Sequence, residues 1–399
     1  MKITDIKTYI YHTAWNWLFV KMETDSGLVG WGEATTQGHE KDVEAAIHNL
    51  KEYLIGKDPR QIELHWSTMF RDAYWRPSFI ITTAMSGVEI AMWDILGKSL
   101  NAPVHALLGG ACRERIPIYH NGWWFPAKKP GDYARLAADT VKKTGATALK
   151  WDPLWQCDVF SSRQQIQSAV DNVRSVREAV GDDVELMIDC HARLAPHLSI
   201  QLAHALEEFR PYWYEEPIPT DASVEDLALV ASSINIPVCV GERIPTRWCF
   251  RDIFEKRATA IINPDIGHAG GILETKKIAD MAHAYYIASS PHSAGGPILN
   301  AASLHLDATT PNFLIHEFFS PDIPYYEEII KEPFPIMKGG LIEVPRKPGL
   351  GVELREEMLT KRPYVPQPLR FWSPPGDWAA DAALEERKQP APRKKGKSR

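Results

Sequence analysis

The chain has 399 residues, of which 44% are hydrophobic and 24% are charged. This composition is typical of a globular protein, and the length exceeds what one hydrophobic core supports, so we expect two domains, one of them large. The net charge of −6 and the pI of about 6.2 argue against the broad basic surface that nucleic acid or an anionic membrane would require.

The lack of a recognisable targeting signal and the pattern of cysteines both bear on the compartment of the protein. No apolar run approaches the roughly 18 residues of a membrane span, and the first residues lack the profile of a signal peptide. The five cysteines are odd in number and form no CxxC pair, which argues against a disulfide framework or a zinc site. We therefore expect a cytoplasmic protein with a small-molecule partner and no nucleic-acid or membrane partner.

Residues 1–114 have the pattern of an α+β domain. Alternating polar and apolar residues predict antiparallel strands of a small sheet at 2–11 and 17–25, followed by a turn at 25–33. Helical periodicity follows at 42–55 and 79–101.

Residues 115–320 have a different texture, in which short apolar runs end in polar residues and alternate with helical segments such as 162–181 and 199–210. Eight such runs predict the parallel strands of a (β/α)8 barrel with helices outside. The runs are 116–122, 146–152, 184–192, 212–217, 237–243, 259–265, 286–292 and 313–318.

The barrel pattern ends near residue 320. Residues 338–354 predict a strand, a turn and a loop, and we expect the segment 321–373 to pack back on the N-terminal domain and complete it. Residues 374–399 are basic and lack the apolar content needed to fold, so they predict a disordered tail.

Six acidic or imidazole residues recur in the second half of the chain at intervals of 23 to 27 residues, which is close to one βα unit. They are Asp189, Glu215, Glu242, Asp265, His292 and Glu317. A parallel barrel brings the carboxyl ends of all its strands to one face, so this period predicts that the six side chains converge on a single site.

Three of the six are carboxylates on consecutive strands: Asp189, Glu215 and Glu242. Without a cation, three anions so close would repel one another and raise each other's pKa. A divalent ion resolves this conflict, and an all-oxygen ligand set suits Mg²⁺ better than zinc. We therefore expect one Mg²⁺ per subunit on these three residues.

The remaining residues predict acid–base chemistry at the same mouth. An Asp265–His292 hydrogen bond would fix the imidazole tautomer and make a general base. Lys150, at the end of the strand before the one that ends in Asp189, could neutralise a substrate carboxylate. Glu317 could stabilise an enolate oxygen if it is protonated. Two residues after Asp189, strand alternation directs His191 to the same side, where it is a candidate general acid.

Short motifs follow one another along the chain in the order ALKWDP, IDCHARL, YEEP, VGER, NPDIGHAGG, SPHSAGGP and HEF, with KPGLGVEL near the end. With these motifs in this order, the chain resembles the enolase superfamily over residues 1 to about 370. Within it the resemblance is to the mandelate racemase subgroup and is strongest to its sugar-acid dehydratases, such as galactonate and gluconate dehydratases. It implies an enzyme that dehydrates a sugar acid, an aldonate or aldarate, to a 2-keto-3-deoxy acid and forms a homo-oligomer, an octamer or a dimer.

The resemblance also implies individual roles. Asp189, Glu215 and Glu242 would hold Mg²⁺, the Asp265–His292 dyad would remove the α-proton, and His191 would protonate the departing 3-hydroxyl. Lys150 matches the first lysine of the subgroup's K-x-K motif, and Glu317 its enolate-stabilising acid. The second lysine, which is the opposing base in racemases, is replaced here by Asp152, which favours one-base elimination over epimerisation.

In this family, loops of the small domain close over the barrel mouth and select the substrate. Tryptophan can stack on a sugar face, and arginine can bind a hydroxyl or a second carboxylate. The substrate-binding candidates are Trp15, Trp17, Trp75, Arg76, Trp124, Asp152, Arg193 and Arg243.

Two other functions are compatible with these residues. A cycloisomerase or isomerase of a sugar acid or an anhydro-sugar acid would use the same enolate but give a product of unchanged mass. A non-catalytic binding or regulatory protein could keep the scaffold, and it would then have no need of the metal.

Overall fold

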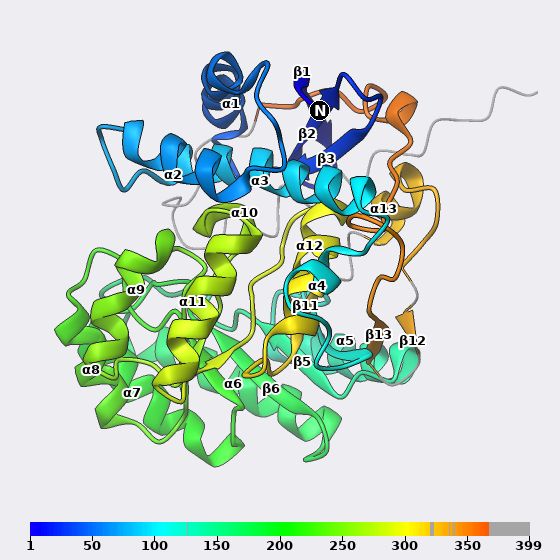
Figure 1. Cartoon of the computed structure of the whole chain (residues 1–399). Coiled ribbons are helices and arrows are strands. Elements are labelled where there is room, and N and C mark those ends of the chain that lie inside the picture. The colour runs from blue at the N-terminus through cyan, green and yellow to red at the C-terminus, as the bar shows by residue number, and fades with distance from the viewer. Residues whose placement is uncertain (126, 320–322, 335, 338–339, 367–399) are drawn as a thin grey trace, which may run out of the picture.

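The N-terminal domain is a three-stranded antiparallel sheet covered by helices (Figure 1). The computed structural model describes residues 1–125, 127–319, 323–334, 336–337 and 340–366. The strands are β1 (Ile3–His12), β2 (Asn16–Thr24) and β3 (Val29–Glu33). The helices are α1 (Glu40–Leu54), α2 (Ile62–Asp72), α3 (Phe79–Ser99) and the short α4 (Val104–Leu107).

The predicted turn at 25–33 is wrong in its second half, because Val29–Glu33 forms β3, which pairs with β2. The glycines of β3 allow the strand to approach α3 closely, and they do not bend the chain there. A Cβ atom on Gly32 would lie 1.8 Å from the carbonyl oxygen of Gly87 on α3. Only a residue without a side chain lets this strand and helix pack so closely.

Among the described residues, α3 is the one helix long and apolar enough to cross a membrane by length and composition, although Glu89 and Asp94 interrupt its apolar residues. Within its most apolar window, 78% is buried inside the protein. The helix packs on the β-sheet and on α1, and it is the core helix of the N-terminal domain.

The barrel domain below has eight parallel strands, one in each of the eight predicted runs, which confirms the predicted fold class (Figure 1). The strands are β4 (Arg115–Asn121), β5 (Ala148–Trp151), β6 (Glu185–Asp189), β7 (Trp213–Glu215), β8 (Val238–Val240), β9 (Ile261–Ile262), β10 (Ala288–Ser289) and β11 (His316–Phe319). They pair in chain order from β4 to β10. The ring is completed by the pairing of β11 with β4 and by a bridge between Ser289 and Phe313.

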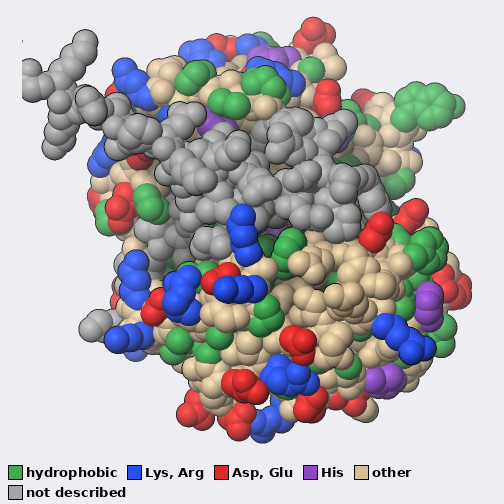
Figure 2. Space-filling model, turned by 180° about the vertical axis from the view of Figure 1, so that it is seen from behind, with side chains coloured by type: hydrophobic (Ala, Val, Ile, Leu, Met, Phe, Trp, Pro, Cys, Tyr) green, Lys and Arg blue, Asp and Glu red, His purple; other side chains and the backbone are tan. Residues whose placement is uncertain are grey.

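Helices follow the strands around the outside of the barrel. They are α5 (Pro130–Thr144), α6 (Arg163–Val180), α7 (Pro196–Leu206), α8 (Val224–Ser233), α9 (Thr246–Glu255), α10 (Ile266–Ala269), α11 (Ile272–Ala284) and α12 (Pro297–Thr309). The start of α6 is set by a capping box, in which Ser162 accepts from the backbone N–H of Gln165 and the Gln165 side chain accepts from that of Ser162. On the face seen in Figure 2, acidic and basic side chains are interspersed over the barrel.

The C-terminal segment contains α13 (Ile323–Ile329), β12 (Ile336–Met337) and β13 (Leu341–Glu343). The prediction that its strand packs on the N-terminal domain was wrong for β13, which extends the barrel sheet by antiparallel pairing with the first half of β4. The loop that follows does reach the N-terminal domain, where the N–H of Leu350 donates to Asp94 on α3. The predicted disordered tail, 374–399, lies outside the described residues.

Two buried glutamates fasten the N-terminal domain to the barrel. Glu33, at the end of β3, accepts from the backbone N–H groups of Gly296 and Leu299 at the start of α12. Glu89 on α3 accepts from Ile272 and Leu273 at the start of α11, each at 2.9 Å. Burial raises the pKa of each carboxyl group to about 7. A carboxylate at a helix N-terminus satisfies N–H groups that have no partner within the helix.

We predict that Glu89→Ala lowers the free energy of unfolding by about 3 kcal/mol or more, because it leaves buried N–H groups of α11 and Trp93 without an acceptor. The measurement is urea unfolding followed by circular dichroism. The exposed Glu52→Ala on α1 is the control and should stay within about 0.5 kcal/mol of the wild type. Equal losses in the two variants would contradict a fastening role.

We also predict an acid-sensitive contribution from His305 on α12, whose Nε2 lies 3.1 Å from the carbonyl oxygen of Leu350. Burial lowers its pKa from 6.5 to about 3. The unfolded chain therefore binds this proton more readily, so the contribution is fully present above pH 6.5 and is lost as the pH falls toward 3, by about 1.4 kcal/mol per pH unit.

Urea unfolding between pH 4 and pH 8 measures this contribution. His305→Gln should flatten the decline in stability below pH 6.5, whereas His283→Gln, at an exposed position of α11, should keep the wild-type slope. Parallel slopes in all three proteins would show that His305 does not titrate as described.

Candidate active site

The three predicted metal ligands meet at the carboxyl ends of consecutive strands. Asp189 ends β6, Glu215 ends β7, and Glu242 lies two residues beyond β8. One carboxylate oxygen from each residue lies within 4.8 Å of the other two. Parallel pairing of β6 with β7 places Asp189 directly opposite Glu215. The arrangement could hold a metal ion, because the donor set is three clustered carboxylates at largely buried positions.

Lys150, at the end of β5, is the cation of this cluster. Its Nζ lies 2.7 Å from Glu215, 3.0 Å from Glu317 and 3.8 Å from Asp189. Burial by itself would lower the pKa of Lys150, but Glu215 and Glu317 hold that pKa well above its usual range. The lysine is 1% exposed, and its raised pKa favours the charged form inside the barrel mouth.

Glu215 shows that one lysine does not balance the cluster. Burial raises its pKa, Lys150 opposes that shift, and the neighbouring acids Asp189 and Glu242 add to it, so the pKa lies well above its ordinary value. A carboxyl group in this state takes up either a proton or a cation. The residues present therefore fit a divalent ion.

His292 and Asp265 form the predicted dyad. His292 Nδ1 lies 2.6 Å from Asp265 Oδ2, while Nε2 points to Glu242 at 3.5 Å and to Glu317 at 3.8 Å. Burial would lower the pKa of His292, but the charges of Glu317 and Glu242 and the bond to Asp265 raise it to about 10. Because Nδ1 is engaged by Asp265, Nε2 is the nitrogen that can exchange a proton with a ligand.

His191 reaches the cluster by a route that differs from the predicted one. The strand β6 ends at Asp189, and His191 and Ala192 adopt left-handed backbone angles, with φ of 45° and 57°. A turn, and not strand alternation, therefore brings His191 Nε2 to 3.1 Å from Asp189. Residues held in this region of backbone space cost free energy and cluster at functional sites.

Asp152 is the partner of His191. Its Oδ2 lies 2.7 Å from His191 Nδ1 and also accepts from Arg193, while Oδ1 accepts from the N–H of Leu154. Asp152 was predicted to bind substrate, but its side chain is fully buried and bonds to these three residues of the protein. Burial would raise its pKa, but Arg193 and His191 lower it to about 2.

Glu317, on β11, acts as an acceptor in this structure. Its two oxygens accept from the side-chain amide of Asn121 and the N–H of Ser293, each at 2.9 Å. Burial would raise its pKa, but Lys150 and His292 lower it to about 2. Both oxygens accept here, and stabilisation of an enolate oxygen by a protonated Glu317 stays a prediction for the substrate complex.

The substrate-binding candidates divide into two groups. Arg193 and Arg243 both lie in the cluster. Arg193 forms an ion pair with Asp152, and Arg243 Nε lies 3.1 Å from Glu242 Oε1. Trp124 donates to Asn121, which in turn donates to Glu317. Trp15 extends from the β1–β2 loop to the barrel mouth, where its ring packs edge-on against Phe319.

The other three candidates lie elsewhere. Trp17 is fully buried in the core of the N-terminal domain, stacked on Tyr11, so its predicted role at the substrate was wrong. Trp75 is 84% exposed, and Arg76 lies over the ring of Phe70. Neither makes a contact with the carboxylate cluster among the interactions of the described residues.

The sequence interpretation missed two asparagines that organise the site. Asn121 at the end of β4 holds Glu317, and Asn263 just after β9 donates to Glu215 at 2.8 Å. Both occupy the strand-end position that identified the charged residues. The same positional rule, applied to amides as well as charges, would have found them.

Residues 132–358 match the enolase C-terminal domain-like family, and residues 10–109 match the N-terminal domain of mandelate racemase / muconate lactonizing enzymes. The chain belongs to this family of the enolase superfamily. Its curated dehydratase relatives further place it among the hydro-lyases.

The D-galactonate dehydratase of Xanthomonas campestris pv. campestris (strain B100) is 38% identical over 400 residues, covering 97% of this chain and 100% of that protein. The D-galactonate dehydratase of Cronobacter sakazakii is 38% identical over 91% of this chain and 94% of its own. A solved enolase-superfamily member from Salmonella Typhimurium has a TM-score of 0.86 at 32% identity, covering 91% of this chain and 98% of that one.

We predict that a millimolar divalent cation raises the melting temperature of the protein relative to EDTA, because binding to the native state alone stabilises it. The measurement is differential scanning fluorimetry with Mg²⁺. Glu242→Gln should lose most of the shift, whereas Glu52→Gln, on an exposed face of α1, should retain it. An unchanged shift in Glu242→Gln would place the cation elsewhere.

Proposed function

We propose that this protein catalyses the Mg²⁺-dependent dehydration of a sugar acid, an aldonate or aldarate, to a 2-keto-3-deoxy sugar acid. The observation that carries the proposal is a row of three carboxylates with an imidazole at each end. His191 adjoins Asp189, and His292 adjoins Glu242. The similarity to D-galactonate dehydratases supports the choice of a sugar acid.

The ion would be held by Asp189, Glu215 and Glu242, whose oxygen donors match the preference of Mg²⁺. When bound, Mg²⁺ would stabilise the negative charge that develops on the substrate carboxylate as the neighbouring C–H bond is broken. The charged Lys150, fixed between Glu215 and Glu317, adds positive potential at the same place.

His292 is the proposed base. Its Nε2 would take the proton from the carbon next to the substrate carboxylate, while Asp265 holds Nδ1 and stabilises the imidazolium that forms. The charges of Glu317 and Glu242 contribute to the His292 pKa of about 10. A cation held by Glu242 would offset one of these charges, which would favour the neutral, accepting form of the imidazole.

His191 is the proposed acid. Burial opposes its protonation, but Asp189 and Asp152 raise the pKa of His191, which favours the protonated form that a general acid requires. Donation from Nε2 to the β-hydroxyl lets it leave as water while the electrons of the broken C–H bond form the C=C bond. The resulting enol then tautomerises to the 2-keto-3-deoxy acid.

Asp152 supports elimination over racemisation. A two-base racemisation needs a second base on the opposite face of the α-carbon, where relatives of the racemase type carry a lysine. Here that position holds an aspartate whose hydrogen bonds go to His191, Arg193 and Leu154. The residue therefore positions the general acid and takes no proton from substrate.

We predict that His292→Asn lowers dehydration by at least about 10²-fold and also abolishes exchange of the α-proton, because the base is lost. His191→Asn should lower dehydration to a similar degree but retain measurable exchange into D₂O, because only the leaving group loses its proton donor. NMR measures exchange, and a keto-acid assay measures product. The exposed His197→Asn on α7 is the control and should behave as the wild type.

The function is tested by screening the protein with Mg²⁺ against C4 to C6 mono- and di-acid sugars, using semicarbazide to detect 2-keto acids, and repeating hits in EDTA. A hit that chelation removes supports the proposal and identifies the substrate's stereochemistry. A product of unchanged mass would instead identify a cycloisomerase. Undiminished turnover in EDTA would contradict the metal requirement, and full activity in His292→Asn would contradict the base.

A further inference from the structure

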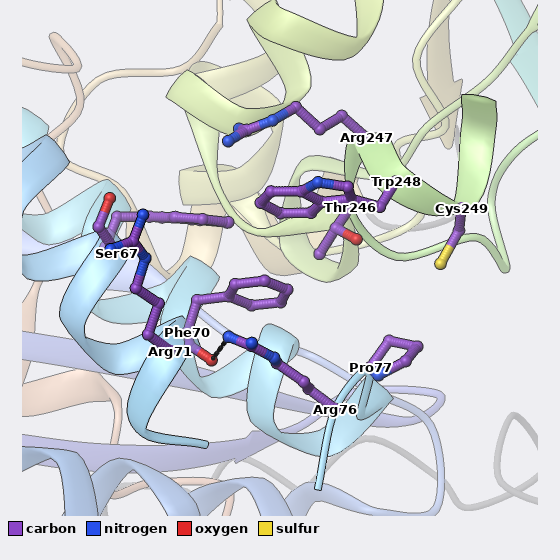
Figure 3. Close-up of a pocket in the computed structure, with 10 residues that line it drawn as sticks. Ser67, Phe70, Arg71, Arg76, Pro77, Thr246, Arg247, Trp248 and Cys249 are labelled. Carbon is purple, nitrogen blue, oxygen red and sulfur yellow. Dashed lines mark hydrogen bonds between the residues drawn. The ribbon is translucent and has the colours of Figure 1, made fainter. Parts of the chain in front are cut away.

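A cavity of about 530 Å³ lies outside the catalytic cluster, between α2 of the N-terminal domain and the first turn of α9 on the barrel (Figure 3). None of the carboxylates, histidines or lysine described above lines it. Its volume is in the range of pockets that hold small molecules. The role of this cavity is therefore a separate question from that of the active site.

The charge of the cavity wall is one-sided. Three arginines line it, namely Arg71, Arg76 and Arg247, and no aspartate or glutamate does. The Arg247 guanidinium forms an ion pair with the buried Glu274. The Arg71 guanidinium makes no ion pair or hydrogen bond with the described residues, and the Arg76 guanidinium donates only to the carbonyl oxygen of Phe70. Two guanidinium groups thus lack an acidic partner in a protein whose net charge is −6.

Two of these guanidinium groups are held in place by a stack that joins the two domains. Arg247 lies 4.1 Å over the Trp248 ring, Trp248 stacks on Phe70 at 4.8 Å and 2°, and Arg76 lies 5.0 Å from the Phe70 centroid (Figure 3). Stacking uses the faces of guanidinium groups and leaves their in-plane N–H donors available. It also covers the faces of Trp248 and Phe70, so a planar ring has little room to stack there.

A further donor faces the same cavity. Thr246 lines it and is 1% exposed, and its hydroxyl has no hydrogen-bond partner among the described residues beyond the weakly bonding thiol of Cys249. A buried hydroxyl with so weak a partner is costly unless a ligand or water satisfies it. Thr246 is also the first residue of the ten-residue α9, so the positive end of that helix borders the cavity.

We propose that this cavity is a second binding site for a small oxyanion, the carboxylate or phosphate group of a hydroxylated small molecule. The oxyanion receives in-plane N–H donors from Arg71 and Arg76, while Thr246, at the opposite end of the cavity from Arg71, hydrogen-bonds a hydroxyl group of the same molecule (Figure 3). The aromatic edges contact the carbon skeleton. The site is independent of the catalytic cluster, so its occupancy does not depend on turnover.

The test is isothermal titration calorimetry of the full-length protein in EDTA at fixed ionic strength, with inorganic phosphate and with D-galactonate as separate titrants. We expect saturable binding of at least one, weakened about tenfold or more in Arg71→Gln, because a charge-assisted bidentate contact is lost. Arg251→Gln, on α9 but outside the cavity and paired with Asp252, is the matched control and should bind as the wild type.

Arg71 is exposed at the end of α2, so its replacement should not disturb folding, and circular dichroism checks this. Thr246→Val should weaken the same titrant without removing it. Binding of phosphate identifies a simple anion site, and binding of D-galactonate alone identifies a sugar-acid site. Absence of saturable binding of both titrants, or equal affinity in Arg71→Gln and the wild type, would overturn the proposal whatever the dehydratase assays show.

Discussion

The charge of Lys150 is the constraint on which the barrel mouth depends. Its ammonium group lies within 4 Å of Glu215, Glu317 and Asp189, and none of these groups is open to water. Charges buried without a partner are costly, so the lysine and the acids each require the other to remain ionised. Lys150 still leaves the pKa of Glu215 well above its ordinary value, and a carboxyl group in this state can take up a metal ion in place of a proton.

The same electrostatic logic separates the two histidines. Each histidine is held at Nδ1 by its own aspartate and presents Nε2 to the carboxylate row. The two histidines follow different strands, however, and lie at opposite ends of that row. Dyads at the two ends of one charged row provide an acid and a base for a single elimination without competing for the same proton. The strained turn at His191 and Ala192 is the backbone feature that makes this possible.

The N-terminal domain contributes through buried anions of its own. Glu33 and Glu89 fasten it to the first turns of α12 and α11, and Asp94 fastens the C-terminal segment. These contacts hold the loop that carries Trp15 against Phe319 and hold α2 against α9. The cavity with three arginines exists only because two domains are fixed in this relation.

The sequence by itself determined the eight strands, their order, and the residues at their ends, because a parallel barrel converts a regular βα period into convergence at one face. It therefore predicted the grouping of Asp189, Glu215, Glu242, Asp265, His292 and Glu317, and the presence of Lys150 beside them. Apart from the Asp265–His292 pair, only the tertiary structure decided which groups pair. The Asp152–His191 bond, the acceptor state of Glu317, the burial of Trp17 and the position of β13 depend on contacts between distant segments. Local periodicity carries no information about such contacts, because they are set by side-chain packing and by the field of all the neighbouring charges.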